Sequence, residues 1–186
     1  MRVIAGRAGG LRLLSPKRGV RPTMDRVKGA IFSSLGEMVI GAGVLDLFAG
    51  SGALGIEALS RGAASALFVE EDRQSTLAIE KNLAKAKLAG RIRQQEVFSF
   101  LKVATTLGEK FRIIFADPPY DKMKSGDSYT DKLLSDKVLP GLLDTDGVFV
   151  LEKRPSEEVP QTKLWQIDRQ KAYGATEVLF LSANRE

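Results

Sequence analysis

Residues 44–59, VLDLFAGSGALGIEAL, decide the fold. The apolar run at 44–48 is typical of a buried strand, and glycines follow at positions 50, 52 and 55. These glycines match G-x-G-x-x-G between a strand and a helix, where the motif brings backbone N–H groups close to a ligand. The stretch therefore predicts a strand–loop–helix unit that binds a nucleoside-containing cofactor. A glycine-rich turn without any ligand is the alternative.

Strands and helices continue to alternate along the chain. Apolar strands between helices predict a parallel, doubly wound α/β sheet with helices on both faces and ligands beyond the carboxyl ends of the strands. The polar strand at 91–96 is expected near an edge of the sheet. The expected strands are 44–48, 66–70, 91–96, 111–117, 147–152, 164–167 and 177–181, and the expected helices are 53–61, 73–88, 98–107 and one within 129–143.

Residues 1–40 are expected to form a basic N-terminal extension that packs on a main domain of residues 41–186. The segment 2–14 predicts a β-hairpin of two short strands around a glycine-rich turn, and a basic loop follows it. Thr23 is expected to be the N-cap of a helix whose apolar residues recur at helical spacing.

The positive charge is concentrated in the first 28 residues. The whole chain carries a net charge of +5, and residues 1–28 alone carry +7, so the remainder sums to −2. Clustered basic side chains neutralise phosphates, which favours binding to nucleic acid; a merely solvated basic surface is the alternative. The residues expected to contact phosphates are Arg7, Arg12, Lys17 and Arg18.

The composition excludes several kinds of chemistry. The chain of 186 residues has the length of one domain and contains neither Cys nor His. Disulfides, thiolate nucleophiles, Ser-His-Asp triads and zinc fingers are therefore impossible, and no metal is expected. The sequence has no apolar run of membrane-spanning length and no signal-peptide pattern at its start. We therefore expect a cytoplasmic protein without a membrane partner.

Two acidic residues flank the glycine motif. Glu70 ends the second expected strand, where a carboxylate can accept both hydroxyls of a ribose, and this fits NAD and S-adenosylmethionine equally well. Asp46 interrupts the first apolar strand. Its carboxylate would suit a ligand that bears an ammonium group and would fit poorly beside a pyrophosphate. Asp46 therefore favours S-adenosylmethionine, with a role limited to capping loop N–H groups as the alternative.

The tetrapeptide Asp117-Pro118-Pro119-Tyr120 ends the most apolar strand. Its prolines keep the backbone extended and lack N–H groups, so they leave carbonyl acceptors beside a carboxylate and an aromatic ring. This set suits an exocyclic amine on a planar base. Asp117 and the Pro118 carbonyl would accept its N–H groups, and Tyr120 would stack on the ring. A proline-rich turn in which Asp117 caps a helix is the alternative.

The motifs together resemble a known family. Residues 44–59, LFVEED (67–72), EVFSFL (96–101) and FADPPY (115–120) resemble class I S-adenosylmethionine-dependent amino-methyltransferases with a Rossmann-like sheet of seven strands. The start of the chain is more specific. MRVIAGRAGG (1–10) and RPTMDRVKGAIFSSL (21–35) resemble the small, single-domain bacterial 16S rRNA guanine-N2 methyltransferases.

The resemblance implies roles for individual residues. Glu70 would bind the cofactor ribose, Glu96 and Val97 its adenine, and Asp117 to Tyr120 the target guanine. Glu96 stands where the family more often has Asp or Asn, so the adenine contact departs from the usual pattern. The residues implied to line the rest of the cofactor are Asp46, Phe48, Ala49, Gly50, Ser51, Gly52 and Asp117, and those implied to close over the site and help contact RNA are Arg21, Pro22, Thr23, Asp25 and Arg26.

The sequence therefore predicts methyl transfer from S-adenosylmethionine to the exocyclic N2 of a guanine in 16S rRNA. The expected partner is that rRNA, within a small ribosomal subunit or its assembly intermediate. The first alternative is an amino-methyltransferase that acts on DNA adenine or on another RNA. A more distant alternative is an NAD-dependent oxidoreductase, which would leave residues 117–120 without a role. A non-catalytic RNA-binding module is also possible.

Overall fold

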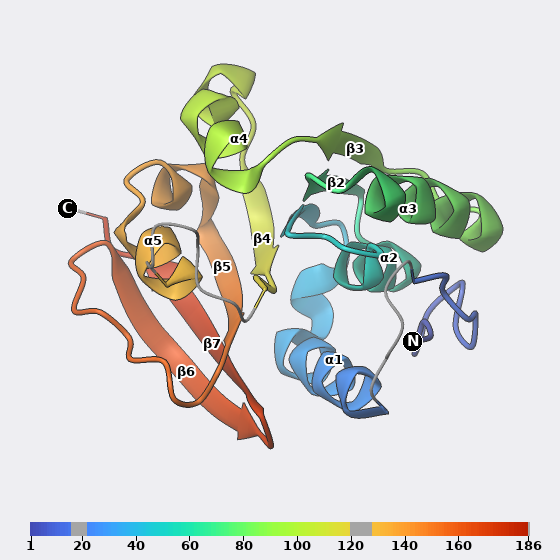
Figure 1. Cartoon of the computed structure of the whole chain (residues 1–186), viewed down its shortest axis with the longest axis horizontal. Helices are drawn as coiled ribbons and strands as arrows, with labels where there is room; N and C mark the ends of the chain where they lie inside the picture. Colours follow the sequence, from blue (N-terminus) through green and yellow to red (C-terminus); the bar gives the residue numbers. More distant parts are fainter. Residues whose placement is uncertain (16–21, 120–127, 186) are drawn as a thin grey trace.

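The computed structural model describes residues 1–15, 22–119 and 128–185 as a seven-stranded sheet with helices on both faces (Figure 1). The strand order is β3-β2-β1-β4-β5-β7-β6. The first five strands in this order are parallel, and β7 runs antiparallel to β5 and β6. The expected parallel sheet is thus a mixed one. The strands are β1 (Gly43–Leu47), β2 (Ser65–Glu70), β3 (Arg91–Gln94), β4 (Phe111–Ala116), β5 (Leu143–Lys153), β6 (Trp165–Tyr173) and β7 (Thr176–Ala183).

The helices divide between the two faces because successive side chains of a strand point to opposite sides. Val44 of β1 shares a buried cluster with Phe32, Ile56 and Ile79. Its neighbour Leu45 belongs to a second cluster, on the other face. Helices α1, α2 and α3 therefore cover one face, and α4 and α5 cover the other (Figure 1). The helices are α1 (Pro22–Leu35), α2 (Ala53–Ser60), α3 (Arg73–Ala86), α4 (Val97–Ala104) and α5 (Tyr129–Ser135), with 3-10 turns η1 (Gly36–Val39), η2 (Thr105–Leu107) and η3 (Leu139–Leu142).

The predicted edge position of β3 is confirmed, and the central strands lie close to their predicted ranges. The C-terminal strands are longer than expected. Strand β5 begins at Leu143 rather than at residue 147, and β6 extends to Tyr173 rather than to residue 167. Strand β6 is an edge strand whose side chains are exposed from Gln166 to Ala172, so no apolar alternation marks its length.

The predicted N-terminal hairpin is wrong in its extent. One antiparallel bridge, Arg2 to Arg12, takes the place of two strands. Hydrogen bonds of 2.9 and 3.0 Å join Val3 N to Leu11 O and Leu13 N to Met1 O across this bridge, and other N–H groups of the segment bond to α2. Those of Ile4 and Ala5 donate to the Glu57 carboxylate at 2.7 and 3.1 Å, and that of Ala8 donates to Ser60 Oγ at 2.9 Å. The segment is therefore a shorter hairpin than predicted, and it is held by α2 as well as by its own antiparallel hydrogen bonds.

Gly6 shows how closely the segment approaches α2. A Cβ atom at this position would lie 1.9 Å from the Ser60 carbonyl oxygen, and φ is +82°. Only glycine combines that contact with that conformation. Val3 is fully buried in the same cluster as Phe32 of α1. A boundary at residue 40 between an extension and a main domain stays a proposal.

Helix α1 begins two residues earlier than an N-cap at Thr23 predicts. Pro22 is its first residue, so Thr23 is not the N-cap. The fixed φ of proline suits the first turn of a helix, where the missing N–H costs nothing. The helix ends at Leu35 and continues into η1. Phe32 packs against Phe115 of β4 with ring centroids 5.6 Å apart, and this contact sets α1 beside the carboxyl end of β4.

Candidate active site

The loop between β1 and α2 turns through residues with positive φ. Phe48, Gly50 and Gly52 have φ of 56°, 55° and 77°, and a hydrogen bond of 2.7 Å from Gly52 N to Ala49 O closes the turn. Positive φ is unusual for Phe48 and marks a constrained position. Gly52 caps α2 without a side-chain hydrogen bond. The side-chain acceptor at the N-terminus of α2 therefore comes from Asp46 of β1 rather than from the N-cap residue.

Asp46 is buried beneath this loop. Its Oδ2 atom accepts a hydrogen bond of 2.8 Å from Gly55 N, and 2% of the residue is exposed. A Cβ atom on Gly55 would lie 2.3 Å from the Phe68 ring and 3.1 Å from the same Oδ2 atom, so only glycine fits there. Burial raises the pKa of Asp46 to about 8, although the Gly55 N–H acts to lower it. A cation beside this carboxyl group would favour its ionised form.

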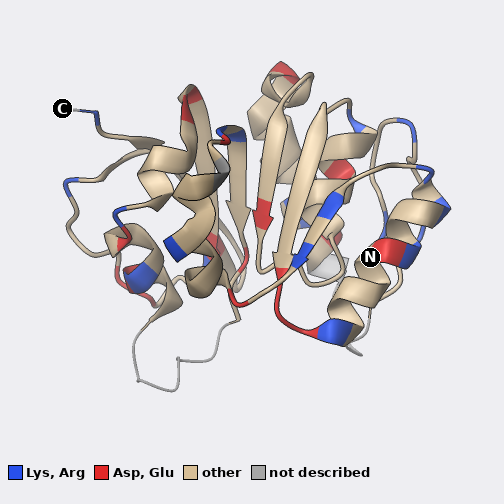
Figure 2. Ribbon diagram, turned by 90° about the horizontal axis from the view of Figure 1, so that it is seen from above, with Lys and Arg blue, Asp and Glu red and all other residues tan. Residues whose placement is uncertain are grey.

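Glu70 holds the loop from the end of β2. Its Oε2 atom accepts from Gly50 N and its Oε1 atom from Asp72 N, both at 2.8 Å. Each carboxylate oxygen keeps a further acceptor position, so two ribose hydroxyls can donate to Glu70 in addition to these N–H groups. Figure 2 shows acidic residues where central strands run into their following loops. The glycine loop, Asp46 and Glu70 thus lie together at the ends of β1 and β2.

Glu96 is the N-cap of α4. Its two carboxylate oxygens accept from Phe98 N and Ser99 N at 2.8 Å. Burial acts to raise the pKa of Glu96, but these N–H groups lower it below its ordinary value. The structure therefore gives this carboxylate a structural partner, and Val97 beside it is buried. The adenine contact expected of these two residues stays a prediction.

An aromatic group beside α4 was not predicted. The Phe48 ring packs edge-on against Phe98 and Tyr129 with centroids 6.3 and 5.4 Å apart, and the Lys132 ammonium lies 4.0 Å from the Phe98 centroid. These residues come from the loop after β1, from α4 and from α5. No motif links them in the sequence. The positive φ of Phe48 is what turns its ring toward this group.

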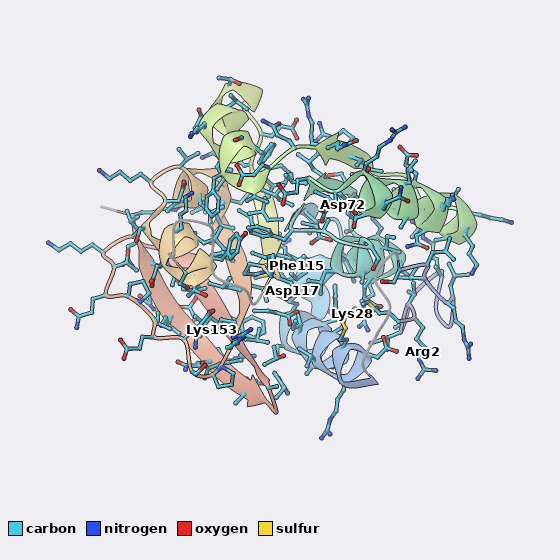
Figure 3. All side chains as sticks on the ribbon, in the orientation of Figure 1. Arg2, Lys28, Asp72, Phe115, Asp117 and Lys153 are labelled. Carbon is cyan, nitrogen blue, oxygen red and sulfur yellow. The ribbon has the colours of Figure 1, made fainter. Side chains whose placement is uncertain are left out.

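Asp117 lies one residue beyond the end of β4, between the sheet and α1 (Figure 3). It shares strand parity with Phe115, which faces α1. Burial raises the pKa of Asp117 to about 6. Pro118 is buried and Pro119 is exposed. Tyr120 lies outside the described residues, so its stacking role stays a prediction.

Glu152 of β5 is an acidic residue that sequence reasoning missed. Its pKa is raised well above the ordinary value by burial and by the nearby charges of Asp117 and Asp46. Three carboxyl groups therefore approach one another at the ends of β1, β4 and β5. The sequence does show a glutamate near the end of an apolar strand. It does not show that this strand, β5, pairs with β4, which precedes it by about 30 residues along the chain.

The candidate RNA-binding residues are described only in part. Arg7, Arg12 and Arg26 are exposed, the first two on the N-terminal segment and the third on α1. Lys17, Arg18 and Arg21 lie outside the described residues, as does the side chain of Thr23. RNA contact by these residues stays a prediction.

Asn82 of α3 connects the N-terminal segment with the glycine loop. Its Oδ1 atom accepts from Leu14 N at 2.8 Å, and its Nδ2 atom donates to Leu14 O at 2.9 Å and to Ser51 O at 3.0 Å. The side chain is fully buried. The end of the basic segment and the loop expected to hold the cofactor are thus fixed to the same amide group.

Among the described residues, no cluster of acidic side chains has the composition of a metal site. Within the same part of the chain, no helix is long and apolar enough to cross a membrane.

A family model described as "Conserved hypothetical protein 95" matches residues 1–182. A curated relative, "Ribosomal RNA small subunit methyltransferase D" of Escherichia coli, is 36% identical over 177 residues, which cover 94% of this chain and 85% of the relative.

Solved structures agree with the fold. "Putative methyltransferase yhhF" from Escherichia coli has a TM-score of 0.78 and 34% identity, and the match covers 100% of this chain and 99% of that one. The Thermus thermophilus "16S rRNA N2 G1207 methyltransferase (RsmC)", in complex with AdoMet and guanosine, has a TM-score of 0.69 and 25% identity over 91% of this chain and 45% of that one. The predicted seven-stranded methyltransferase sheet is confirmed.

Proposed function

Since the chain belongs to the family described as Conserved hypothetical protein 95, which includes small-subunit rRNA methyltransferases, we propose that it methylates the exocyclic N2 of a guanine in 16S rRNA. As a member of this family the chain is an S-adenosylmethionine-dependent rRNA methyltransferase. The guanine, the N2 atom and the residue roles belong to the proposal. An NAD-dependent oxidoreductase is excluded by the family.

The observation that carries the proposal is the row of carboxyl groups at neighbouring strand ends. Asp46 is the last residue but one of β1, Glu70 ends β2 and Asp117 follows β4, and these three strands are adjacent in the sheet. Asp46 has the position and charge to hold a cationic amino-acid moiety, and Glu70 has free acceptor positions for ribose hydroxyls. The residues proposed to line the cofactor are Asp46, Phe48, Ala49, Gly50, Ser51, Gly52, Glu70, Glu96, Val97 and Asp117.

The tetrapeptide after β4 is proposed to hold the target base. S-adenosylmethionine supplies an electrophilic methyl group on a sulfonium centre. The Asp117 carboxylate and the Pro118 carbonyl accept the N2–H groups, which keeps lone-pair density on N2 while the N–C bond forms and the C–S bond breaks. The carboxylate of Asp117 is also the acceptor closest to the proton that N2 then releases. Proton acceptance agrees with the pKa of about 6.

The target guanine must be accessible as a single base. A base paired in a helix cannot present its amine to residues at the ends of buried strands, so the guanine lies in a loop or is flipped out. The exposed arginines of the N-terminal segment and of α1 provide the charge to hold the RNA around it. We propose a small ribosomal subunit or its assembly intermediate as the form of the substrate, which places the reaction in the cytoplasm.

The test is methyl transfer from labelled S-adenosylmethionine to naked 16S rRNA, to assembly intermediates and to complete small subunits, followed by mapping of the modified nucleotide. We expect a single N2-methylguanine. Label at an adenine amine, or incorporation into DNA but not into rRNA, would contradict the proposal.

A further inference from the structure

Glu152 and Asp117 are neighbours on one face of the sheet. Strands β4 and β5 are parallel, with Ala116 paired to Leu151, so the next residues in register are Asp117 and Glu152. Adjacent strands lie about 4.8 Å apart. Glu152 shares strand parity with Val150, which belongs to the same buried cluster as Phe115. Both carboxyl groups therefore point toward the α1 side of the sheet.

Neither group has a partner among the residues that the structure describes. There, no hydrogen-bond donor reaches the Asp117 or Glu152 side chain, whereas Asp46 accepts from Gly55 N. The adjacent Lys153 does not neutralise Glu152. Its ammonium is buried 2.6 Å from Glu177 Oε2 and donates to the carbonyls of Arg154 and Glu157. Both residues are half-buried, so their carboxylate oxygens keep acceptor positions open to a ligand that brings donors.

Guanine presents two adjacent donors, the N1–H and the N2 amine. Adenine and cytosine present a ring nitrogen with a lone pair beside their amine instead. The strand order also matches the order of atoms in guanine. The cofactor loop follows β1, Asp117 follows β4, and Glu152 lies on β5, farther from the loop. A guanine with N2 toward the methyl donor and Asp117 therefore places N1 toward Glu152.

We propose that Glu152 selects guanine by accepting a hydrogen bond from its N1–H. This inference rests on the proposed function and adds a residue to it: Asp117 holds the amine that is methylated, and Glu152 identifies the base. A base with a lone pair at N1 directs that pair against the ionised carboxylate and loses the hydrogen bond that guanine makes with this form of Glu152. A site built to bond a polar group discriminates strongly against an analogue that lacks it.

The test compares guanine with 2,6-diaminopurine at the mapped target position of otherwise identical rRNA. Both bases carry the 2-amino group, but 2,6-diaminopurine has a lone pair at N1. The wild-type protein should methylate guanine with a kcat/KM roughly 10²-fold higher or more. Glu152→Gln should reduce this ratio to within about tenfold, because an amide can accept from N1–H or donate to a lone pair.

Three controls make the outcome decisive. Asp146→Asn changes an exposed carboxylate at the other end of β5 and should leave the ratio unchanged. Glu152→Asp keeps the carboxylate and should keep the preference for guanine if Glu152→Gln fails to fold. Calorimetry with S-adenosylhomocysteine checks that each variant binds the cofactor product as the wild type does.

The failure of this inference differs from the failure of the proposed function. If the wild-type protein methylates both bases equally, or if Glu152→Gln keeps the full preference, Glu152 does not read the base. If the wild-type protein modifies no guanine N2 in any form of the rRNA, the proposed function itself fails.

Discussion

The Lys28 ammonium lies 3.1 Å from Oε2 of Glu57, and both side chains are buried. This ion pair joins α1 to α2 on the face of the sheet that carries Asp117. Glu57 also accepts from Ile4 N and Ala5 N and pairs with Arg61 at 2.7 Å. Burial lowers the pKa of Lys28, and the Glu57 charge acts against that shift. One carboxylate thus holds three parts of the chain together.

Glu57→Gln should strongly destabilise the protein, because it leaves the Lys28 charge buried without a counter-charge. The expected loss is about 3–5 kcal/mol in the free energy of unfolding, measured by urea denaturation. Glu80→Gln, on the exposed side of α3, is the matched control and should change stability little. A loss below about 1 kcal/mol would mean that α1 and the N-terminal segment are held by apolar packing.

Asp46→Asn should stabilise the protein while it weakens cofactor binding. Because the pKa of Asp46 is raised to about 8, the folded state binds more protons than the unfolded state between about pH 4 and pH 8. Stability contributed by this group is therefore complete at low pH and is lost as pH rises toward 8. Asparagine keeps an oxygen for Gly55 N and carries no charge. Urea denaturation should show a higher free energy of unfolding at pH 8 and a smaller fall between pH 5 and pH 8.

The same variant should bind S-adenosylhomocysteine at least about tenfold more weakly by calorimetry, since a charged partner is lost. Asp131→Asn, at an exposed position of α5, controls for a change of net charge. Part of the pH slope should persist in Asp46→Asn, because the pKa of Asp117 is also raised. If the free energy of unfolding of Asp46→Asn falls with pH as steeply as that of the wild type, Asp46 is not the titrating group.

Glu70→Ala should weaken S-adenosylhomocysteine binding roughly 10- to 100-fold with little change in melting temperature. It removes the acceptor of Gly50 N and Asp72 N together with the expected ribose partner. Glu71→Ala, at the exposed neighbouring position, should bind as the wild type does. Calorimetry measures the affinities of both variants for S-adenosylhomocysteine and for NAD, and thermal denaturation measures their melting temperatures. Equal affinities for Glu70→Ala and the wild type would remove Glu70 from the cofactor site.

RNA binding should depend on the basic N-terminal segment. Replacement of Arg7, Arg12, Lys17 and Arg18 by Ala should weaken binding to 16S rRNA and flatten its dependence on salt, because fewer counterions are released. Affinity for S-adenosylhomocysteine should hardly change. The measurement is a filter-binding titration at several salt concentrations.

A second quadruple variant removes the same charge from exposed positions on other elements: Lys81, Lys87, Lys102 and Lys137. Its salt slope should remain close to that of the wild type. Equal slopes for both variants would show that the N-terminal charge acts only through the overall field of the protein.

Asp117→Ala should lower kcat on the order of 10²-fold or more while cofactor affinity is nearly kept, because the lost acceptor matters most in the transition state. Asp117→Asn is the sharper test, because it keeps the size of the side chain and directs an amide NH2 group toward the guanine amine. Tyr120→Phe should be mild, and Tyr120→Ala should lose about 1–3 kcal/mol of stacking. Single-turnover assays on rRNA measure each. Near wild-type turnover by Asp117→Ala would make residues 117–120 a structural turn.

The sequence predicts best what is local. Buried strands such as β1 and β4 are continuous apolar runs, and an acid within or at the end of such a run, as at Asp46 and Glu70, stands out by its position. Strand β6 cannot be identified from an apolar run in this way. Its exposed, edge location leaves it without an apolar pattern, so its length is set by pairing with β7.

Contacts between distant segments could not be predicted. In the sequence, Glu57 is recognisable only as a polar residue on a short predicted helix. Nothing in the sequence indicates that the backbone N–H groups of residues 4 and 5 donate to its carboxylate. Glu152 stands beside Asp117 only because β5 pairs with β4 in one particular register. The N-terminal hairpin was expected from local pattern and is present in a shorter form, but the bonds from Ile4 N and Ala5 N to α2 could not be foreseen.

The attachment of residues 1–14 also sets an order for folding during synthesis. Their acceptors and donors on Glu57, Ser60 and Asn82 are 52 to 68 residues further along the chain. While the ribosome is still adding those residues, the basic segment has no partner to dock on. Residues 1–14 can therefore dock on α2 and α3 only after Glu57, Ser60 and Asn82 have been synthesised.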